Sequence, residues 1–243
     1  MKNEKQIKLE YAHKSEIKRK LERANYRSID GKSLKDFRRI GKYFQGKSYF
    51  FDRKIVNGHL DFEPIASKIA KRETFNVISG RNPSNMLHLG HLSLLLLLLD
   101  MQKLGGDIII PFTNDESLID KKNSSFKEGK EIALKTIPFL IALGFDPKKT
   151  KVFIHTDHPE LYTLAMKYGN TITSNQITSL FGKEATDRPS KMFYRGAVQV
   201  ASILMLQKKY FGGKQPTLVP VSADQHPYIL LARDIAYEHS LTP

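Results

Sequence analysis

The 243-residue chain contains no cysteine, which excludes disulfide bonds and zinc sites built from thiolates. It also lacks a long hydrophobic run. The longest, Leu92 to Leu99, is interrupted by one serine and is too short to cross a bilayer. Half of the first ten residues are charged, and they contain no apolar segment typical of a secretory signal. These absences predict a cytoplasmic protein with no membrane partner.

Acidic residues are scarce relative to basic ones, and the formal net charge is +14. Residues 1–54 hold seventeen Lys and Arg but only seven Asp and Glu, so most of the excess lies in this segment. A basic arm on a nearly neutral body suits a polyanionic partner such as RNA. A solvated, charged helix explains the same pattern equally well.

The basic segment is predicted to be a helical extension, residues 1–47, followed by a domain over residues 48–243. Interleaved charges with scattered apolar anchors favour a helix over residues 3–24. Ser33 has the position of a residue that caps a second helix. The extension therefore reads as two basic helices.

Two further local predictions concern the start of the domain. Residues 49–51 and 55–56 are rich in aromatic and β-branched side chains and are predicted to pair as strands about Asp52. Asp61 is predicted to cap a helix that follows it, with Pro64 in the first turn.

After residue 74 short apolar runs alternate with helical segments, which is typical of a parallel, doubly wound α/β sheet of the Rossmann type. The predicted strands are residues 75–79, 107–113, 151–155 and 217–222. The predicted helices are residues 92–104, 125–143, 159–168, 190–209 and 227–239. Ligands of such sheets bind at the carboxyl ends of the strands. The loops that follow the strands are therefore the places to look for a site.

The loop after the first of these strands, residues 79–91, has the residues of an anion site. Gly80 and Gly90 allow a backbone to approach a ligand closely. His88 and His91 lie where a helix would begin, and free N–H groups and the helix dipole favour an anion there. Both histidines could instead serve only as helix caps.

Six sequence blocks, in order, make the chain resemble the class I aminoacyl-tRNA synthetases, specifically the archaeal and eukaryotic type of tryptophanyl-tRNA synthetase. The resemblance runs from about Tyr49 to the carboxyl terminus. The blocks are Ser79-Gly80-Arg81-x-Pro83-Ser84 with His88-Leu89-Gly90-His91, Thr113-Asn114-Asp115-Glu116, Gly144-Phe145-Asp146-x-x-Lys149-Thr150, Thr173-x-Asn175-Gln176 with Phe181-Gly182, Ala197-Val198-Gln199-Val200-Ala201, and Ala223-Asp224-Gln225-His226-Pro227-Tyr228 with Arg233-Asp234.

The resemblance implies an enzyme that joins an amino acid to ATP and transfers the aminoacyl group to tRNA. His88, His91 and Arg81 would be its catalytic residues. ATP would be bound by residues of the loop together with one glutamine, and Mg²⁺ would accompany the pyrophosphate. No metal site of the protein itself is implied, and family members are dimers. The residues implied for ATP are Gly80, Arg81, Ser84, His88, Gly90, His91 and Gln199.

For the amino acid, the resemblance implies that Glu116 faces the substrate's amino group. Gln199 and Gln225 match glutamines that hydrogen-bond the substrate, and Asp224 precedes the second. Ile78 takes the place of a family tyrosine that contacts the indole, and Pro111 takes the place of a glutamine. Taken without the resemblance, Gln199 could be a core amide and Gln225 a helix cap. His155, Asp157 and His158 could hold a metal, although their spacing also suits a helix start.

The family also has a Lys-Met-Ser-x-Ser loop and a helical anticodon-binding domain, which would follow Pro243. We therefore expect a carboxyl-terminally incomplete catalytic domain, impaired in this form. Tryptophan is the expected substrate. The alternatives are a catalytically silent paralogue that binds RNA or a nucleotide, and a synthetase for tyrosine or another amino acid.

Overall fold

The computed structural model describes residues 35–36, 44, 46–53, 55–56, 58–120, 125–208, 213–222 and 225–242. The helix expected over residues 3–24 lies outside these ranges. None of the described helices is long and apolar enough to cross a membrane.

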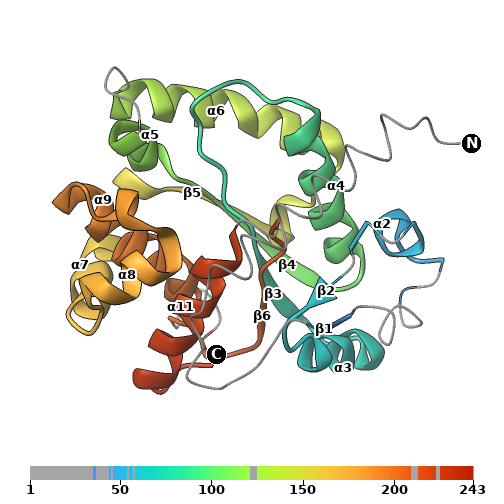
Figure 1. Cartoon of the computed structure of the whole chain (residues 1–243). Helices are drawn as coiled ribbons and strands as arrows, with labels where there is room; N and C mark the ends of the chain where they lie inside the picture. Colours follow the sequence, from blue (N-terminus) through green and yellow to red (C-terminus); the bar gives the residue numbers. More distant parts are fainter. Residues whose placement is uncertain are drawn as a thin grey trace, which may run out of the picture.

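Four parallel strands form the central sheet, in the order β5-β4-β3-β6 (Figure 1). Their bounds are Phe75–Ile78 for β3, Gly106–Phe112 for β4, Thr150–Ile154 for β5 and Thr217–Leu218 for β6. All four lie within or at the edge of the predicted strands, so the parallel α/β architecture is confirmed. The strand β6 ends early, and Pro220 just beyond it has no N–H to continue a ladder.

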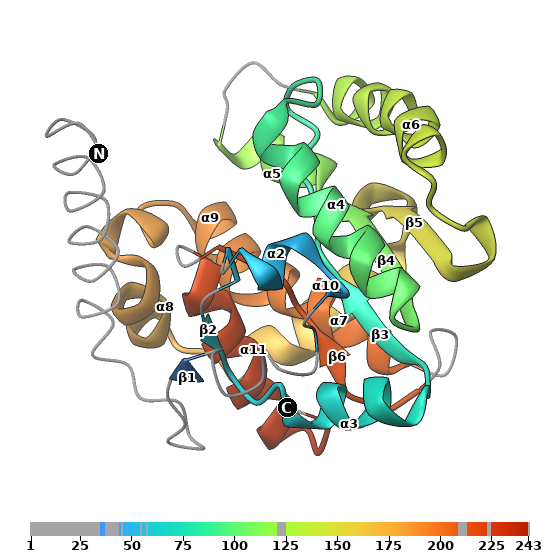
Figure 2. The ribbon, with the colours of Figure 1, turned by 90° about the vertical axis from the view of Figure 1, so that its right-hand side faces the viewer.

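Helices cover both faces of the sheet (Figures 1 and 2). Side chains alternate between two cores: Val77 packs on one face with α3, α4 and α6, and Ile78 on the other with α7, α10 and α11. Burial on both faces explains why the strands are continuously apolar. The helix bounds are Glu63–Lys71 for α3, Leu89–Lys103 for α4, Phe126–Leu143 for α6, Pro159–Gly169 for α7, Gln199–Leu204 for α10 and His226–Glu238 for α11.

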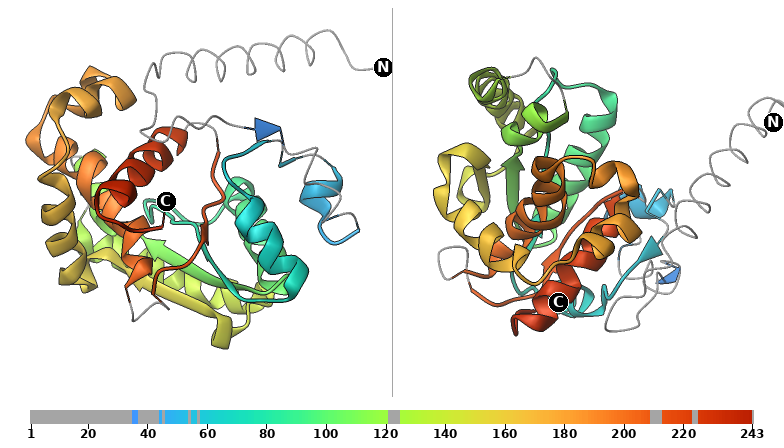
Figure 3. Two further views of the ribbon diagram at one scale, coloured as in Figure 1. Left: turned by 90° about the horizontal axis from the view of Figure 1, so that it is seen from below. Right: turned by 60° about the vertical axis from the view of Figure 1, so that its left-hand side comes forward.

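The region before α3 differs from the predictions. Lys35–Asp36 is a strand, β1, that pairs antiparallel with β2, Gly58–His59, so the helix expected from Ser33 is wrong there. The stretch Tyr49–Asp52 is a short helix, α2, and not a strand, because the hydroxyl of Ser48 accepts from the amide of Phe50 and caps it. The blue helix α2 lies on the same side of the molecule as α3, and the gold and orange helices α8, Ser174–Phe181, and α9, Pro189–Phe193, lie on the opposite side (Figures 1 and 3).

Asp61 does not cap α3. Its backbone has a positive φ of 51°, and its carboxylate accepts from Nη2 of Arg233 on α11 at 2.8 Å. Phe62 occupies the cap position, and Pro64 lies in the first turn as expected. An ion pair with a distant helix thus replaces the local cap.

The long helix predicted over residues 190–209 is confirmed as one continuous helical run over residues 189–207, which changes type along its length. It consists of α9, a π-turn at Tyr194–Val198, α10 and a 3₁₀ turn at Met205–Gln207. Two short helices were not predicted, α8 and α5, Asn114–Asp120. Of these, α5 contributes residues to the candidate site described next.

Candidate active site

The order of the strands creates a crevice beside β3. The chain runs from β3 outward through β4 to β5, then returns to β6 on the opposite side of β3. In open α/β sheets, ligands bind at the carboxyl ends of the strands where the order reverses. Here the hydroxyl of Ser79, after β3, donates to the carbonyl of Pro220, after β6, at 3.1 Å. Pro220 also lines a cavity of about 1040 Å³, together with Gly90, Ser222 and His226.

Arg81 fastens the loop that follows β3. Its Nη1 donates to Oγ1 of Thr136 on α6 at 3.1 Å, and its Nη2 donates to the carbonyl of Asn85. The side chain is 8% exposed, its burial lowers its pKa, and it forms no ion pair with the described residues. Within the described part of the chain its Nε has no hydrogen-bond partner. Arg81 therefore supports the loop from beneath as a buried cation.

The two histidines of the loop begin α4 with a reciprocal cap. Nδ1 of His88 accepts from the amide of Gly90 at 3.2 Å, and Nδ1 of His91 accepts from the amide of His88 at 3.4 Å. An acceptor nitrogen carries no proton, so each neutral ring carries its proton on Nε2. The Nε2 atoms have no hydrogen-bond partner among the described residues. Both histidines therefore cap α4, and the capping bonds leave two N–H donors for a ligand.

These groups converge on one small cavity. Its volume is about 250 Å³, and it lies between the loop, the start of α4 and one face of α6. Gly90 lines the larger cavity instead. The residues of the predicted ATP site that line the small cavity are Gly80, Arg81, Ser84, His88 and His91.

The histidine pKa values predict that stability falls in mildly acidic solution. Burial, then the charges of Arg81 and His88, hold the pKa of His91 below its ordinary value of 6.5, and burial lowers the pKa of His226. The unfolded chain therefore binds more protons, so their contribution to the unfolding free energy is complete above 6.5 and is lost as pH falls through the lowered values.

We expect the urea midpoint to decrease between about pH 7.5 and 5.5, and His226→Asn to reduce this decrease. A His226→Asn variant with the same pH dependence as the parent protein would contradict the assignment to His226.

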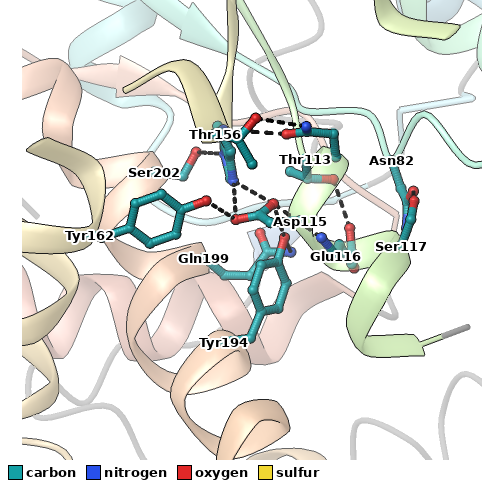
Figure 4. Close-up of polar contacts among 12 residues, drawn as sticks. Asn82, Thr113, Asp115, Glu116, Ser117, Thr156, Tyr162, Tyr194, Gln199 and Ser202 are labelled. Atoms are coloured by element: carbon teal, nitrogen blue, oxygen red, sulfur yellow. Dashed lines mark hydrogen bonds and ion pairs between the residues drawn. The ribbon is translucent and has the colours of Figure 1, made fainter. Parts of the chain in front are cut away.

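A second group of polar side chains lies at the ends of β4 and β5 (Figure 4). Asp115, in the first turn of α5, accepts from Nδ1 of His155 at 3.0 Å and from the hydroxyl of Tyr162 at 2.9 Å. The hydroxyl of Tyr194 donates to the same carboxylate at 3.4 Å. Asp115 is buried, so these donors replace the water it loses.

The group extends to α10. Nε2 of the fully buried His155 lies 2.9 Å from Oγ of Ser202, and Nε2 of Gln199 donates to the hydroxyl of Tyr194 at 3.3 Å. Burial, followed by the charges of neighbouring carboxylates, raises the pKa of Tyr162 and Tyr194, so both phenols remain protonated. The arrangement Asp115–His155–Ser202 resembles a catalytic triad, but it is closed to solvent.

The residues predicted for the amino acid are distributed unevenly. Gln199 belongs to this polar group, and Glu116 lies next to Asp115, accepting from the hydroxyl of Thr113 at 2.8 Å. Ile78 is 2% exposed and packs in the core beneath α7 and α10. Gln225 occupies the cap position of α11, without a side-chain cap bond. Asp224 lies outside the described residues.

The sequence prediction missed the residues that hold this group together: Asp115, His155, Tyr162, Tyr194 and Ser202. One signal was available, because His155 ends a predicted strand and Asp115 begins the segment after the neighbouring strand. No set of three or more metal-binding side chains comes together among the described residues, and His155 is bonded to Asp115 and Ser202.

Comparison with known proteins agrees with this geometry. Residues 70–242 match the family described as tRNA synthetases class I (W and Y). The match covers more than half of the chain, so the chain belongs to this family. Its parallel sheet is accordingly the Rossmann-type sheet of a class I synthetase catalytic domain.

Particular relatives are tryptophan enzymes. The chain is 36% identical over 191 residues to the tryptophan–tRNA ligase of Methanocaldococcus jannaschii, covering 77% of this chain and 51% of that protein. It is 33% identical over 190 residues to the tryptophan–tRNA ligase of Thermoplasma volcanium, covering 77% of this chain and 43% of that protein. The chain thus spans about half the length of the curated relatives it matches.

Solved structures of the same kind are similar in fold. The tryptophanyl-tRNA synthetase of Aeropyrum pernix aligns with a TM-score of 0.76 at 28% identity, covering 85% of this chain and 57% of that one. The enzyme from Encephalitozoon cuniculi bound to tryptophan aligns with a TM-score of 0.76 at 27% identity, covering 86% and 64%.

Proposed function

We propose that the protein activates tryptophan with ATP and passes the aminoacyl group to tRNA. Family membership supports the reaction class, and the names of the relatives support tryptophan as the substrate. In the first step a carboxylate oxygen of tryptophan attacks the α-phosphorus of ATP and pyrophosphate leaves, which gives an aminoacyl-adenylate. In the second step a hydroxyl of the tRNA's terminal adenosine attacks the aminoacyl carbonyl and AMP leaves.

One observation carries the proposal: His88 and His91 line the small cavity beneath the loop, and their Nδ1 atoms are engaged in capping, which leaves the Nε2–H groups for a ligand. The attack spreads negative charge over the phosphate oxygens, and fixed donors stabilise such charge without having to reorganise. Gly80, Ser84 and Gly90 let the loop and the start of α4 approach the nucleotide. The positive charge of Arg81, buried beneath the loop, adds to the attraction.

We infer that the amino acid lies beside α5, at the polar group of Figure 4. The carboxylate of Glu116 pairs with the substrate's ammonium, and Gln199 hydrogen-bonds the same group. Gln225 closes the pocket from the start of α11, and Ile78 contributes to its apolar floor. Asp224 is proposed to bind the substrate on the resemblance alone. An unpaired polar group in such a pocket costs about 1–3 kcal/mol, which would discriminate against substrates that lack an ammonium.

Mg²⁺ is proposed as the counter-ion of the phosphates. The described side chains that line the small cavity include no carboxylate, the protein group that most often binds Mg²⁺. Phosphate oxygens and water would therefore hold it, and the protein's own groups would orient the phosphates.

We further propose a cytoplasmic homodimer as the working form. On one side of α6, Leu134 is 49% and Ile141 61% exposed, and a second copy of the chain could cover them. Sedimentation at micromolar concentration would decide between monomer and dimer.

Exchange of labelled pyrophosphate into ATP tests the proposed reaction. We expect exchange that depends on tryptophan and is weaker with tyrosine. Exchange that is absent with every amino acid, while ATP still binds, would favour the catalytically silent paralogue.

A further inference from the structure

The buried carboxylate of Asp115 imposes one direction on the hydrogen bonds around it. An ionised carboxylate only accepts, so His155 must present a protonated Nδ1, and Tyr162 and Tyr194 must direct their single hydroxyl protons to it. His155 in turn is held through Nε2 by Ser202 on α10. Asp115 is thus fixed from three sides.

This direction continues to Gln199. The single proton of the Tyr194 hydroxyl is directed to Asp115, and Thr113 also hydrogen-bonds this hydroxyl. Toward Gln199 the Tyr194 oxygen is therefore an acceptor. The amide of Gln199 must therefore face Tyr194 with its NH₂ group, as the 3.3 Å contact has it. The carbonyl oxygen Oε1 is left without a donor among the described residues. The hydrogen bonds thus fix the orientation of the Gln199 amide, whose oxygen Oε1 is the atom that can accept from a ligand.

The π-turn makes this contact possible. In a regular α-helix, residues five apart are separated by about 140° around the axis, so Tyr194 and Gln199 would face different directions. Here the amide of Gln199 donates to the carbonyl of Tyr194, closing a wider turn that brings the two side chains to one face. Such turns are frequent at functional sites.

We propose that Asp115, acting through Tyr194, is a positioning residue that presents Oε1 of Gln199 to the ammonium of the amino-acid substrate. The inference rests on the proposed function for the identity of the ligand. It assigns roles to two residues that do not themselves need to touch the reacting atoms. Tyr162 supports the same carboxylate and forms no hydrogen bond to Gln199 or Glu116, which makes it a matched control.

The test compares Tyr194→Phe with Tyr162→Phe, each of which removes one hydroxyl from Asp115. Calorimetry would use tryptophan, tryptamine, which has the ammonium without the carboxylate, and indole-3-propionate, which has the carboxylate without the ammonium. Tyr194→Phe should weaken binding of the two ammonium ligands about tenfold and of indole-3-propionate less than about twofold. Tyr162→Phe should change binding of all three less than about twofold.

Two results would overturn the inference and leave the proposed function intact. One is that both variants lose the same affinity for the ammonium ligands. The other is that Tyr194→Phe loses as much affinity for indole-3-propionate as for the ammonium ligands. Failure of the parent protein to bind any of the three probes would instead contradict the proposed function. In that event the NMR chemical shifts of the Gln199 side-chain NH₂ group test the positioning role without a ligand. A shift caused by Tyr194→Phe but not by Tyr162→Phe supports the positioning role, and no shift in Tyr194→Phe overturns it.

Discussion

Replacing His88 by asparagine is expected to slow tryptophan-dependent exchange of pyrophosphate into ATP about 100-fold, with little change in the midpoint of thermal unfolding. The Oδ1 atom of asparagine stands where Nδ1 of the histidine stands, so it can still accept from the amide of Gly90. Asparagine has no counterpart of Nε2–H. The substitution therefore removes the proposed phosphate donor and keeps the helix cap.

The control for this prediction is His88→Ala, which removes both groups. It should lose activity to a similar extent and also lose about 1 kcal/mol of stability with the cap. If His88→Asn retains full exchange activity, His88 is only a cap and the proposed role of its Nε2–H is wrong.

The second large effect is expected at Glu116. Glu116→Gln should raise the KM for tryptophan about 50-fold, because a charge-assisted hydrogen bond to the ammonium becomes a neutral one. The maximal rate and the KM for ATP should change little, since the lost interaction is present before and during the reaction. Steady-state exchange at varied tryptophan and ATP concentrations measures all three quantities.

Glu128→Gln provides the matched control for charge. Glu128 is exposed in the first turn of α6 and has no proposed role in binding. It should leave the KM for tryptophan unchanged. A Glu116→Gln variant that lowers the maximal rate while the KM stays constant would place Glu116 outside the amino-acid pocket.

The sheet could be predicted because its strands are buried on both faces. Short continuous apolar runs such as residues 108–110 indicate buried strands, and no described helix is long and apolar enough to cross a membrane. The anion loop could also be predicted, because glycine allows close backbone approach and histidine at a helix start can act as a cap or a donor. The local rules failed where a distant partner decides the structure, as at Asp61, which pairs with Arg233 instead of capping α3.

The polar group around Asp115 could not be derived from local pattern. Its members come from α5, the end of β5, α7, the π-turn and α10, and Asp115 lies 79 positions before Tyr194. The π-turn hid the contact further, because a helical pattern places Tyr194 and Gln199 on different faces. Five of the residues predicted for ATP line one small cavity. The side chain of Ile78 belongs to the core, so its role toward the substrate remains a proposal.

The histidine side chains themselves offer the most direct test of the account. Long-range ¹H–¹⁵N NMR spectra of histidine-labelled protein report which ring nitrogen carries the proton. In the free protein at about pH 7.5, His88 and His91 should both carry the proton on Nε2 and accept at Nδ1. Addition of ATP with Mg²⁺ should shift both Nε2–H signals and leave the tautomers unchanged. Protonation at Nδ1 in the free protein, or Nε2–H signals that do not respond to saturating ATP, would contradict the proposed site.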